Sequence, residues 1–447
     1  MRIQTGAILA VVLMGGVAGA GCSAAPGAFS PDAAASAVAA TVAAMDSPTE
    51  TAAPLPTAEE HALPTAGPTA AAPELTVAYT DGGNVALLAG AGPAVTLTFS
   101  GSVEQVRLSD DGQKVAYTRR PVIDQPVELR VVNRDGTGDT LLMGPADFDA
   151  LYPLGGAVHH DVFLFDFLPN SHVLLLNTRS IFEGPGLAKH DDLIRIDTDS
   201  LARTMLLAPG TGGDFTASPD GRYLALTRPD TVEIRLADGS PSGSGVISYS
   251  PVITYSEYAY YAQPAWSADS AGVAVAIPSP DPFAPAPTGS IWRLPTGGSA
   301  ALAGTISGQF FFFGTGTKPL LAPDLARAAF TRSTTTPNVL SLIIAAADGT
   351  GEVLVGTGSV AWAGWAPDAD HFAFSLGDPL SLQLGDVSGA ISPLLTGIDV
   401  RWFSPTEFLY LSGSMGAWTL QRGGLSAPST PLASPGGDFI DYAFAYR

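Results

Sequence analysis

Cysteine and basic residues are scarce in this sequence of 447 residues. A single cysteine is present, so the chain cannot form an internal disulfide. Only 14% of the residues are charged, and the net charge is −21 because Asp and Glu (42) outnumber Lys and Arg (21). A nucleic-acid binder needs a basic surface for the phosphates, so this balance argues against nucleic acid as a partner. It also argues against docking of the folded part on an anionic lipid surface.

Apolar runs long enough to span a membrane are also missing. The apolar stretch Ile8–Val17 follows Arg2 and is short and rich in glycine, which predicts a signal peptide over residues 1–21. This segment ends in Gly19-Ala20-Gly21-Cys22, which resembles the lipobox of bacterial lipoproteins, with Gly19 in place of the usual leucine. The resemblance implies lipidation at Cys22. An ordinary cleaved signal peptide and an uncleaved anchor are the alternatives.

Residues 22–73 consist mainly of Ala, Pro, Thr and Ser and contain no run of large apolar residues. Such a segment cannot bury a core, so we expect a disordered tether, lipidated at Cys22. The tether would hold a domain over residues 74–447 clear of the membrane. The expected location is therefore extracytoplasmic, lipid-anchored to the cell membrane at the cell surface or in the periplasm.

Fifty glycines and 37 prolines predict many turns and few long helices. One turn and the strand after it recur along residues 74–447. The best copy is Ala217–Thr227 (ASPDGRYLALT), in which Pro219 sets φ, Asp220 can accept backbone hydrogen bonds and Gly221 tolerates a positive φ. The turn acid or its replacement stands at Asp111, Asn170, Asp220, Asp269, Asp324, Asp368 and Thr406. The copies lie roughly 40 to 60 residues apart, which is the period of four-stranded propeller blades.

Two positions of the repeat predict how the blades pack: the large column, three residues before the turn acid, and the small column, five residues after it. Three residues before the turn acid stand mostly large apolar residues: Leu108, Phe167, Ala217, Trp266, Leu321, Trp365 and Phe403. Five residues after it stand mostly alanines: Ala116, Leu175, Ala225, Ala274, Ala329 and Ala373. Alternation of period two predicts a strand, and the repeated alanine predicts close approach of a neighbouring backbone. The turn acids, Asp220 among them, are therefore interpreted as structural.

Strand starts near residues 77, 115, 173, 224, 273, 328, 372 and 408 predict an all-β propeller of eight four-stranded blades, with seven as the alternative. The first unit, at Val77–Thr80, lacks the turn, and a last strand within Asp438–Arg447 has no unit after it. We expect these two strands to close the ring.

The turns, best preserved in Ser218-Pro219-Asp220-Gly221 and Trp365-Ala366-Pro367-Asp368, resemble the TolB-like β-propeller repeat, also called the WD40-like Pro-Asp repeat. The resemblance implies a propeller fold and a habit of binding partners, and it implies no particular reaction. Propellers of prolyl-oligopeptidase-like enzymes are similar but accompany a hydrolase domain, and this sequence has no Gly-x-Ser-x-Gly motif.

Histidines and acids are the first candidates for chemistry. His159, His160, His172 and His190 fall in one region, beside Asp161, Asp191 and Asp192. Their spacing matches no metal motif, so we expect loop and turn histidines with no metal and no cofactor, and a shared zinc-like site is the alternative. The Asp-Gly turns within Asn133–Asp139 and Ala346–Glu352 lack the calcium-loop pattern and are interpreted as hairpins.

Two aromatic stretches are the candidates for ligand binding. They hold Tyr255, Tyr258, Tyr260, Tyr261 and Phe311 and flank the insertion Ser279–Gly289. Such side chains belong either to strand cores or to a binding rim on the loop face. No catalytic residues are proposed. We expect a monomeric, non-catalytic binding or scaffolding propeller for an envelope protein, peptide or glycan. The alternative is an extracytoplasmic hydrolase or lyase acting on glycans or peptides.

Overall fold

The computed structural model describes residues 73–183, 188–255, 258–281, 284–309, 318–377, 381–392 and 396–447. The predicted signal peptide, Cys22 and the tether up to residue 72 lie outside these residues, as does Phe311. No helix among the described residues is long and apolar enough to cross a membrane.

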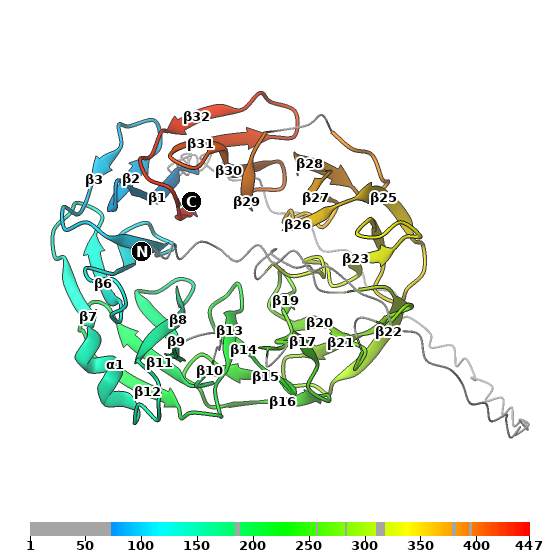
Figure 1. Cartoon of the computed structure of the whole chain (residues 1–447), viewed down its shortest axis with the longest axis horizontal. Helices are drawn as coiled ribbons and strands as arrows, with labels where there is room; N and C mark the ends of the chain where they lie inside the picture. The colour runs from blue at the N-terminus through cyan, green and yellow to red at the C-terminus, as the bar shows by residue number, and fades with distance from the viewer. Residues whose placement is uncertain are drawn as a thin grey trace, which may run out of the picture. The chain divides into compact units, whose positions relative to one another are not determined.

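The predicted eight-bladed propeller is confirmed: eight antiparallel sheets form a ring around a central axis, which is called the channel (Figure 1). The strands of each blade are given from the channel outward. Blade 1 comprises β33 (Tyr442–Tyr446), β1 (Leu75–Asp81), β2 (Asn84–Ala89) and β3 (Val95–Thr96), and blade 2 comprises β4 (Val103–Leu108), β5 (Lys114–Arg119), β6 (Glu128–Asn133) and β7 (Thr140–Met143). Blade 3 comprises β8 (His159–Phe167), β9 (Val173–Ile181), β11 (Leu193–Asp197) and β12 (Arg203–Leu207), and blade 4 comprises β13 (Asp214–Ala217), β14 (Tyr223–Arg228), β15 (Thr231–Leu236) and β16 (Pro241–Ser248).

The remaining blades follow the same order, but only three strands of blade 6 and three of blade 7 lie within the described residues. In blade 6 the innermost segment contacts β23 through single bridges, such as Leu321 to Ala328, so β23 has the second position. Three short elements are added to the ring. Blades 5 to 8 comprise β19 (Ala265–Trp266), β20 (Gly272–Pro278), β21 (Thr288–Pro295) and β22 (Ala301–Ser307); β23 (Arg327–Ser333), β24 (Leu340–Ala346) and β25 (Val353–Gly358); β26 (Val360–Trp365), β27 (His371–Leu376) and β28 (Ser381–Asp386); and β29 (Ile398–Trp402), β30 (Glu407–Ser414), β31 (Ala417–Gly424) and β32 (Thr430–Ala433). The additions are β10 (Ala188–Lys189) on β9, the pair β17 (Ile253–Tyr255) and β18 (Tyr258–Ala259), and the helix α1 (Pro145–Leu151).

The ring closes as expected, because the last strand completes the first blade. β33 pairs with β1 in antiparallel register, with Phe444 opposite Val77. The innermost strand of blade 1 therefore comes from the C-terminal end of the chain, and the other three strands follow residue 73. Closure of this kind leaves no open seam between the first blade and the last.

The two repeat columns have the packing roles that the sequence predicts. Five alanines of the small column, namely Ala116, Ala225, Ala274, Ala329 and Ala373, are all 0% exposed. They lie in the second strand of their blades, where adjacent sheets pack closely. Each turn aspartate accepts a hydrogen bond from the backbone N–H two residues further on, as Asp220 does from Arg222 at 3.0 Å. The structural role of Asp220 follows from this geometry.

One member of the large column is corrected by the strand register. Trp365 lies opposite Phe372 in β26–β27, and Trp402 lies opposite Phe408 in β29–β30. The turn of blade 8 is one residue shorter than the others, so Trp402 takes the position that the sequence alignment assigns to Phe403. The same register gives Phe444 this position in blade 1.

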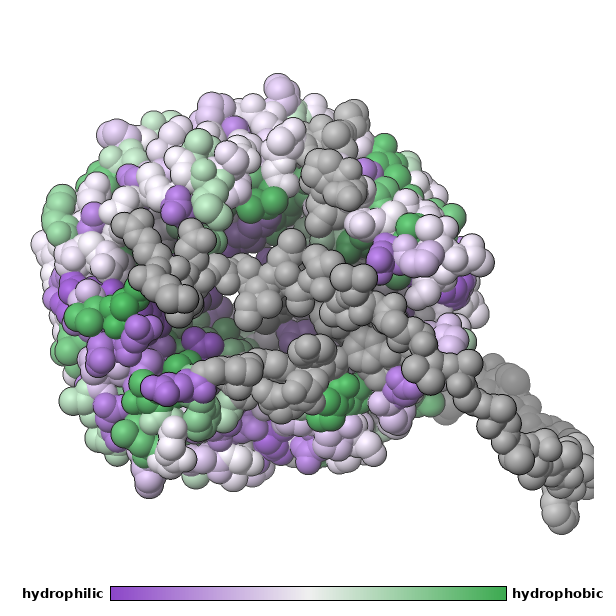
Figure 2. Space-filling view, in the orientation of Figure 1, coloured by the Kyte–Doolittle hydropathy of each residue, from purple (hydrophilic) through white to green (hydrophobic). Residues whose placement is uncertain are grey.

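The described residues on the face seen in Figure 2 form no single apolar patch. In the space-filling view, hydrophilic and hydrophobic residues are interspersed around the visible rim (Figure 2). Scattered apolar residues are normal on soluble domains, so this rim by itself identifies no partner.

Candidate binding site at the channel mouth

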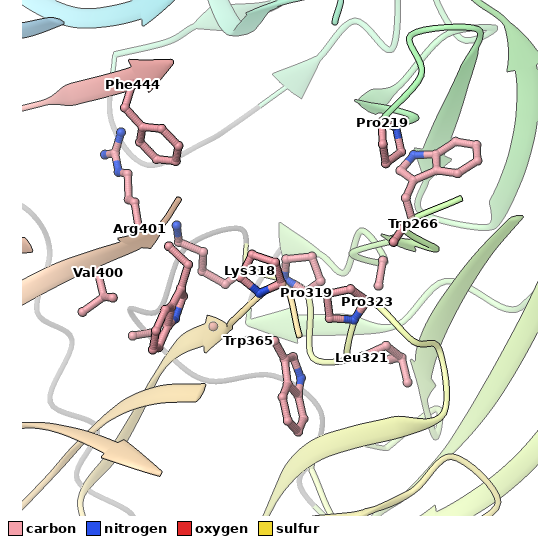
Figure 3. A pocket seen from close by; sticks show the side chains of 16 residues that line it. Pro219, Trp266, Lys318, Pro319, Leu321, Pro323, Trp365, Val400, Arg401 and Phe444 are labelled. Carbon is pink, nitrogen blue, oxygen red and sulfur yellow. The ribbon is translucent and has the colours of Figure 1, made fainter. Parts of the chain in front are cut away.

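A cavity of about 580 Å³ lies at the end of the channel where the innermost strands run into the Asp turns. Five consecutive blades, from blade 5 round to blade 1, each contribute the large-column residue to its wall (Figure 3). These residues are Trp266, Leu321, Trp365, Trp402 and Phe444. The turn prolines Pro219, Pro323 and Pro367 form part of the rim. The repeat that builds the fold therefore also builds the cavity.

Two of the tryptophans are fixed by bonds between blades. The indole Nε1 of Trp266 donates to the carbonyl of Thr216 at 3.2 Å, and that of Trp365 donates to Leu320 at 3.0 Å. Each acceptor lies in the innermost chain segment of the preceding blade. The rings are thus held in place before any ligand arrives, which lowers the entropic cost of binding.

Trp402 departs from this pattern. Its buried Nε1 has no hydrogen-bond partner within the described part of the chain. The corresponding acceptor would be the carbonyl of Gly364, but β26 is bulged there, with Gly364 at φ +118°. The bulge explains why the third tryptophan lacks the bond that the other two make.

Two cations line the otherwise apolar wall, Lys318 from blade 6 and Arg401 from blade 8. Arg401 is neutralised by Asp399 at 2.8 Å and Asp441 at 2.9 Å. Asp441 also accepts from Arg107 of blade 2 at 3.0 Å, so this network joins blades 8, 1 and 2. Burial opposes ionisation of the Asp441 carboxyl, but the two arginines outweigh burial and lower its pKa.

The tyrosines predicted to bind a ligand do not line this cavity. Tyr260 is 9% exposed and packs in the core of blades 4 and 5, with its hydroxyl donating to the carbonyl of Ala276 at 2.9 Å. The backbones of Tyr255 and Tyr258 pair in β17–β18, and their side chains lie outside the described part of the structure.

Tyr261 precedes the innermost strand of blade 5 and so lies toward the opposite end of the blades. Its ring centroid is 3.4 Å from Nζ of Lys189, and its hydroxyl donates to Asp191 at 3.0 Å. Lys189 is in turn paired with Asp214 at 2.6 Å. Burial raises the pKa of Asp191 to about 6. These groups satisfy one another, so they favour a structural contact between blades over a free binding group.

The four clustered histidines do not converge on one place. His160 and His190 lie 4.9 Å apart between ring centroids inside blade 3, and both hydrogen-bond to the hydroxyl of Ser180. His172 lies in a turn, between Asp111 at 2.9 Å and Asp199 at 2.8 Å. His159 is buried, and neither of its ring nitrogens has a partner within the described ranges. Over those ranges, no three His, Cys, Asp or Glu side chains are placed to hold a metal ion.

Sequence reasoning missed Lys318, Arg401, Trp402 and Phe444. Alignment of the blades on the second strand would have found Trp402 and Phe444, since it absorbs the shortened turn of blade 8. Nothing in the sequence pattern separates Lys318 from a surface lysine.

No family model and no curated protein matches the chain. Solved structures with a similar fold include prolyl oligopeptidase B from Galerina marginata, which is 10% identical with TM-score 0.48 over 75% of this chain and 51% of that chain. TolB from Acinetobacter baumannii is 10% identical with TM-score 0.35 over 83% and 66% of the two chains. The β-propeller domain of the Trilobed protease from Pyrococcus furiosus is 13% identical with TM-score 0.43 over 74% and 98%.

The chain spans about half the length of the prolyl oligopeptidase. At these identities the similarity concerns the propeller fold alone. Membership of the Pro-Asp repeat family stays a prediction from the sequence.

Proposed function

We propose that the propeller is a non-catalytic binding module whose protein, peptide or glycan ligand docks in the cavity at the channel mouth. The supporting observation is the composition of the wall, where fixed aromatic rings and prolines surround two cations. The described residues of the wall include no carboxylate, histidine, serine or cysteine side chain, so they offer no acid–base pair or nucleophile. Concave apolar sites with a few directed polar groups are typical of ligand pockets.

A hydrolase is the second candidate because Ser180 Oγ lies 2.9 Å from Nε2 of His190. Nδ1 of that histidine is 2.6 Å from the Thr178 hydroxyl, which donates to Asp192 at 2.7 Å. Ser180 is only 7% exposed and does not line the cavity. This placement favours a buried hydrogen-bond network over a nucleophile open to substrate.

The test is a screen of peptides and glycans by intrinsic tryptophan fluorescence, with analysis of the mixtures for cleavage products. We expect a ligand that binds the wild type, binds the Trp365→Ala variant at least tenfold more weakly and is recovered intact. Trp418→Ala is the matched control, because Trp418 lies in blade 8 outside the cavity wall. Equal binding by the wild type and Trp365→Ala would contradict the proposal. So would cleavage of the ligand that Ser180→Ala abolishes.

We further propose that the chain is a lipoprotein of the cell envelope, anchored through Cys22. The support is the sequence motif and the tether that follows it. Cys22→Ser should move the protein from the membrane fraction to the soluble fraction on centrifugation. Retention of that variant in the membrane fraction would contradict lipidation as the anchor.

A further inference from the structure

Lys318 is a cation without a counter-ion in the cavity wall. Its ammonium makes no ion pair or hydrogen bond with any residue that the structure describes. Figure 3 shows the Lys318 side chain extending toward Arg401. Burial first, and the positive charge of Arg401 second, lower the pKa of Lys318. A cation held in this setting gains from an anion supplied by a ligand.

The bulge at Gly364 makes room for this lysine. The atoms nearest to the place where a Cβ of residue 364 would stand all belong to the Lys318 side chain, at 3.8–4.0 Å. The aliphatic part of Lys318 therefore lies over the glycine. The same bulge leaves the Trp402 indole N–H without its acceptor.

The unpaired polar groups among the described residues of the wall are thus hydrogen-bond donors. Trp402 has a buried N–H donor without an acceptor, and the half-buried Lys318 has an ammonium without a counter-ion among the described residues. The described residues of the wall offer no side-chain acceptor in return. A sugar hydroxyl could accept from these donors, but its own O–H would find no side-chain acceptor among the described residues of the wall. A carboxylate brings only acceptors, and the tryptophans and prolines favour an apolar group attached to it.

We propose that the cavity binds the carboxyl-terminal end of a peptide with apolar or aromatic last residues, an inference that rests on the proposed binding function. The terminal carboxylate pairs with Lys318 Nζ, next to the Arg401 network. The apolar side chains lie among Trp266, Trp365 and Phe444. The remainder of the peptide extends out of the cavity.

The test compares N-acetyl-Ala-Ala-Phe with a free carboxylate and the same peptide as its amide, titrated calorimetrically into the full chain in detergent. We expect the acid to bind at least tenfold more tightly than the amide. Lys318→Met keeps the length of the side chain and removes its charge, so it should abolish this preference and leave the affinity for the amide within about twofold. Lys318→Arg should retain the preference.

Lys114→Met is the matched control, because Lys114 pairs with Asp199 of blade 3, does not line the cavity and should not affect the preference. Equal binding of acid and amide to the wild type, or no binding of either, overturns the proposal. So does 3-phenylpropionate if it binds as tightly as the peptide acid, since the ligand would then be a small acid. If acid and amide bind equally but both depend on Trp365, the carboxylate proposal fails and the binding function stands.

Discussion

The carboxylate of Asp441 lies 2.9 Å from the guanidinium of Arg401, and this ion pair ties the C-terminal strand to blade 8. Arg107 approaches the same carboxylate from blade 2, and the backbone N–H of Val106 donates to it at 2.9 Å. The last strand is therefore held by charge on both sides as well as by its pairing with β1.

Asp441→Asn should destabilise the propeller by about 3 kcal/mol, because it removes the negative charge from between two largely buried arginines. The folded pKa of Asp441 is lowered, so its contribution is present above the unfolded pKa of about 4 and is lost as the pH falls through the folded value. Urea unfolding at pH 7 and at pH 3 checks this prediction. The difference in the free energy of unfolding between wild type and variant should be smaller at pH 3 than at pH 7.

Glu352→Gln is the control for this variant. Its ion pair with Arg332 is 39% exposed on both sides, so its loss should cost less than about 1 kcal/mol. Equal effects of the two substitutions would show that Asp441 has no special part in closure.

Gly221→Ala should destabilise the turn of blade 4 by more than about 2 kcal/mol. Gly221 has φ +71°, and an added Cβ would lie 2.4 Å from the carbonyl oxygen of Pro169 in the neighbouring blade. Gly210→Ala is the control, since φ is +77° there but no atom lies within 4 Å of the added Cβ. Thermal unfolding should show the cost of positive φ alone, about 1 kcal/mol, for Gly210→Ala. Equal costs would mean that the approach of Pro169 relaxes freely.

His190 and His172 should affect stability with opposite dependence on pH. Burial, and then His160, lower the pKa of His190 despite Asp192. The unfolded chain then takes up the proton first, so stability is present above about pH 6.5 and falls as the pH drops below it. Melting temperatures from pH 8 to 5 should decline less steeply for His190→Gln than for the wild type.

Partial burial of His172 disfavours its charged form, but the hydrogen bonds to Asp199 and Asp111 prevail and raise its pKa. Its stabilisation is present below about pH 6.5 and is lost as the pH rises through the folded value. His172→Gln should therefore lower the melting temperature at pH 5 more than at pH 8. The same pH trend in both variants would contradict one of the two assignments.

The repeat made most of the fold predictable. All eight predicted strand starts fall in or beside the second strand of a blade, from β1 at Leu75–Asp81 to β30 at Glu407–Ser414. This success has a physical reason. The Asp turn and the alternating strand are determined by neighbouring residues, and the same pattern recurs in each copy. The shortened turn of blade 8 was misaligned by one residue, because only the pairing of Trp402 with Phe408 shows where the strand register restarts.

The candidate site was much less predictable, because it depends on which residues of different blades come together in space. Trp365 was assigned to packing between sheets, and it also lines the cavity. The aromatic stretch around Tyr260 suggested a rim, whereas Tyr260 is core and Tyr261 is held by Lys189 and Asp191. No sequence rule places Lys318 of blade 6 beside Arg401 of blade 8.

The most direct test is the position of a ligand in a crystal structure of the complex, with the ligand taken from the fluorescence screen. We expect it to lie among Trp266, Trp365 and Phe444, within hydrogen-bond distance of Lys318. A ligand bound elsewhere, for instance beside Tyr261 toward the opposite end of the blades, with the cavity at the Asp turns empty, would contradict the proposed site.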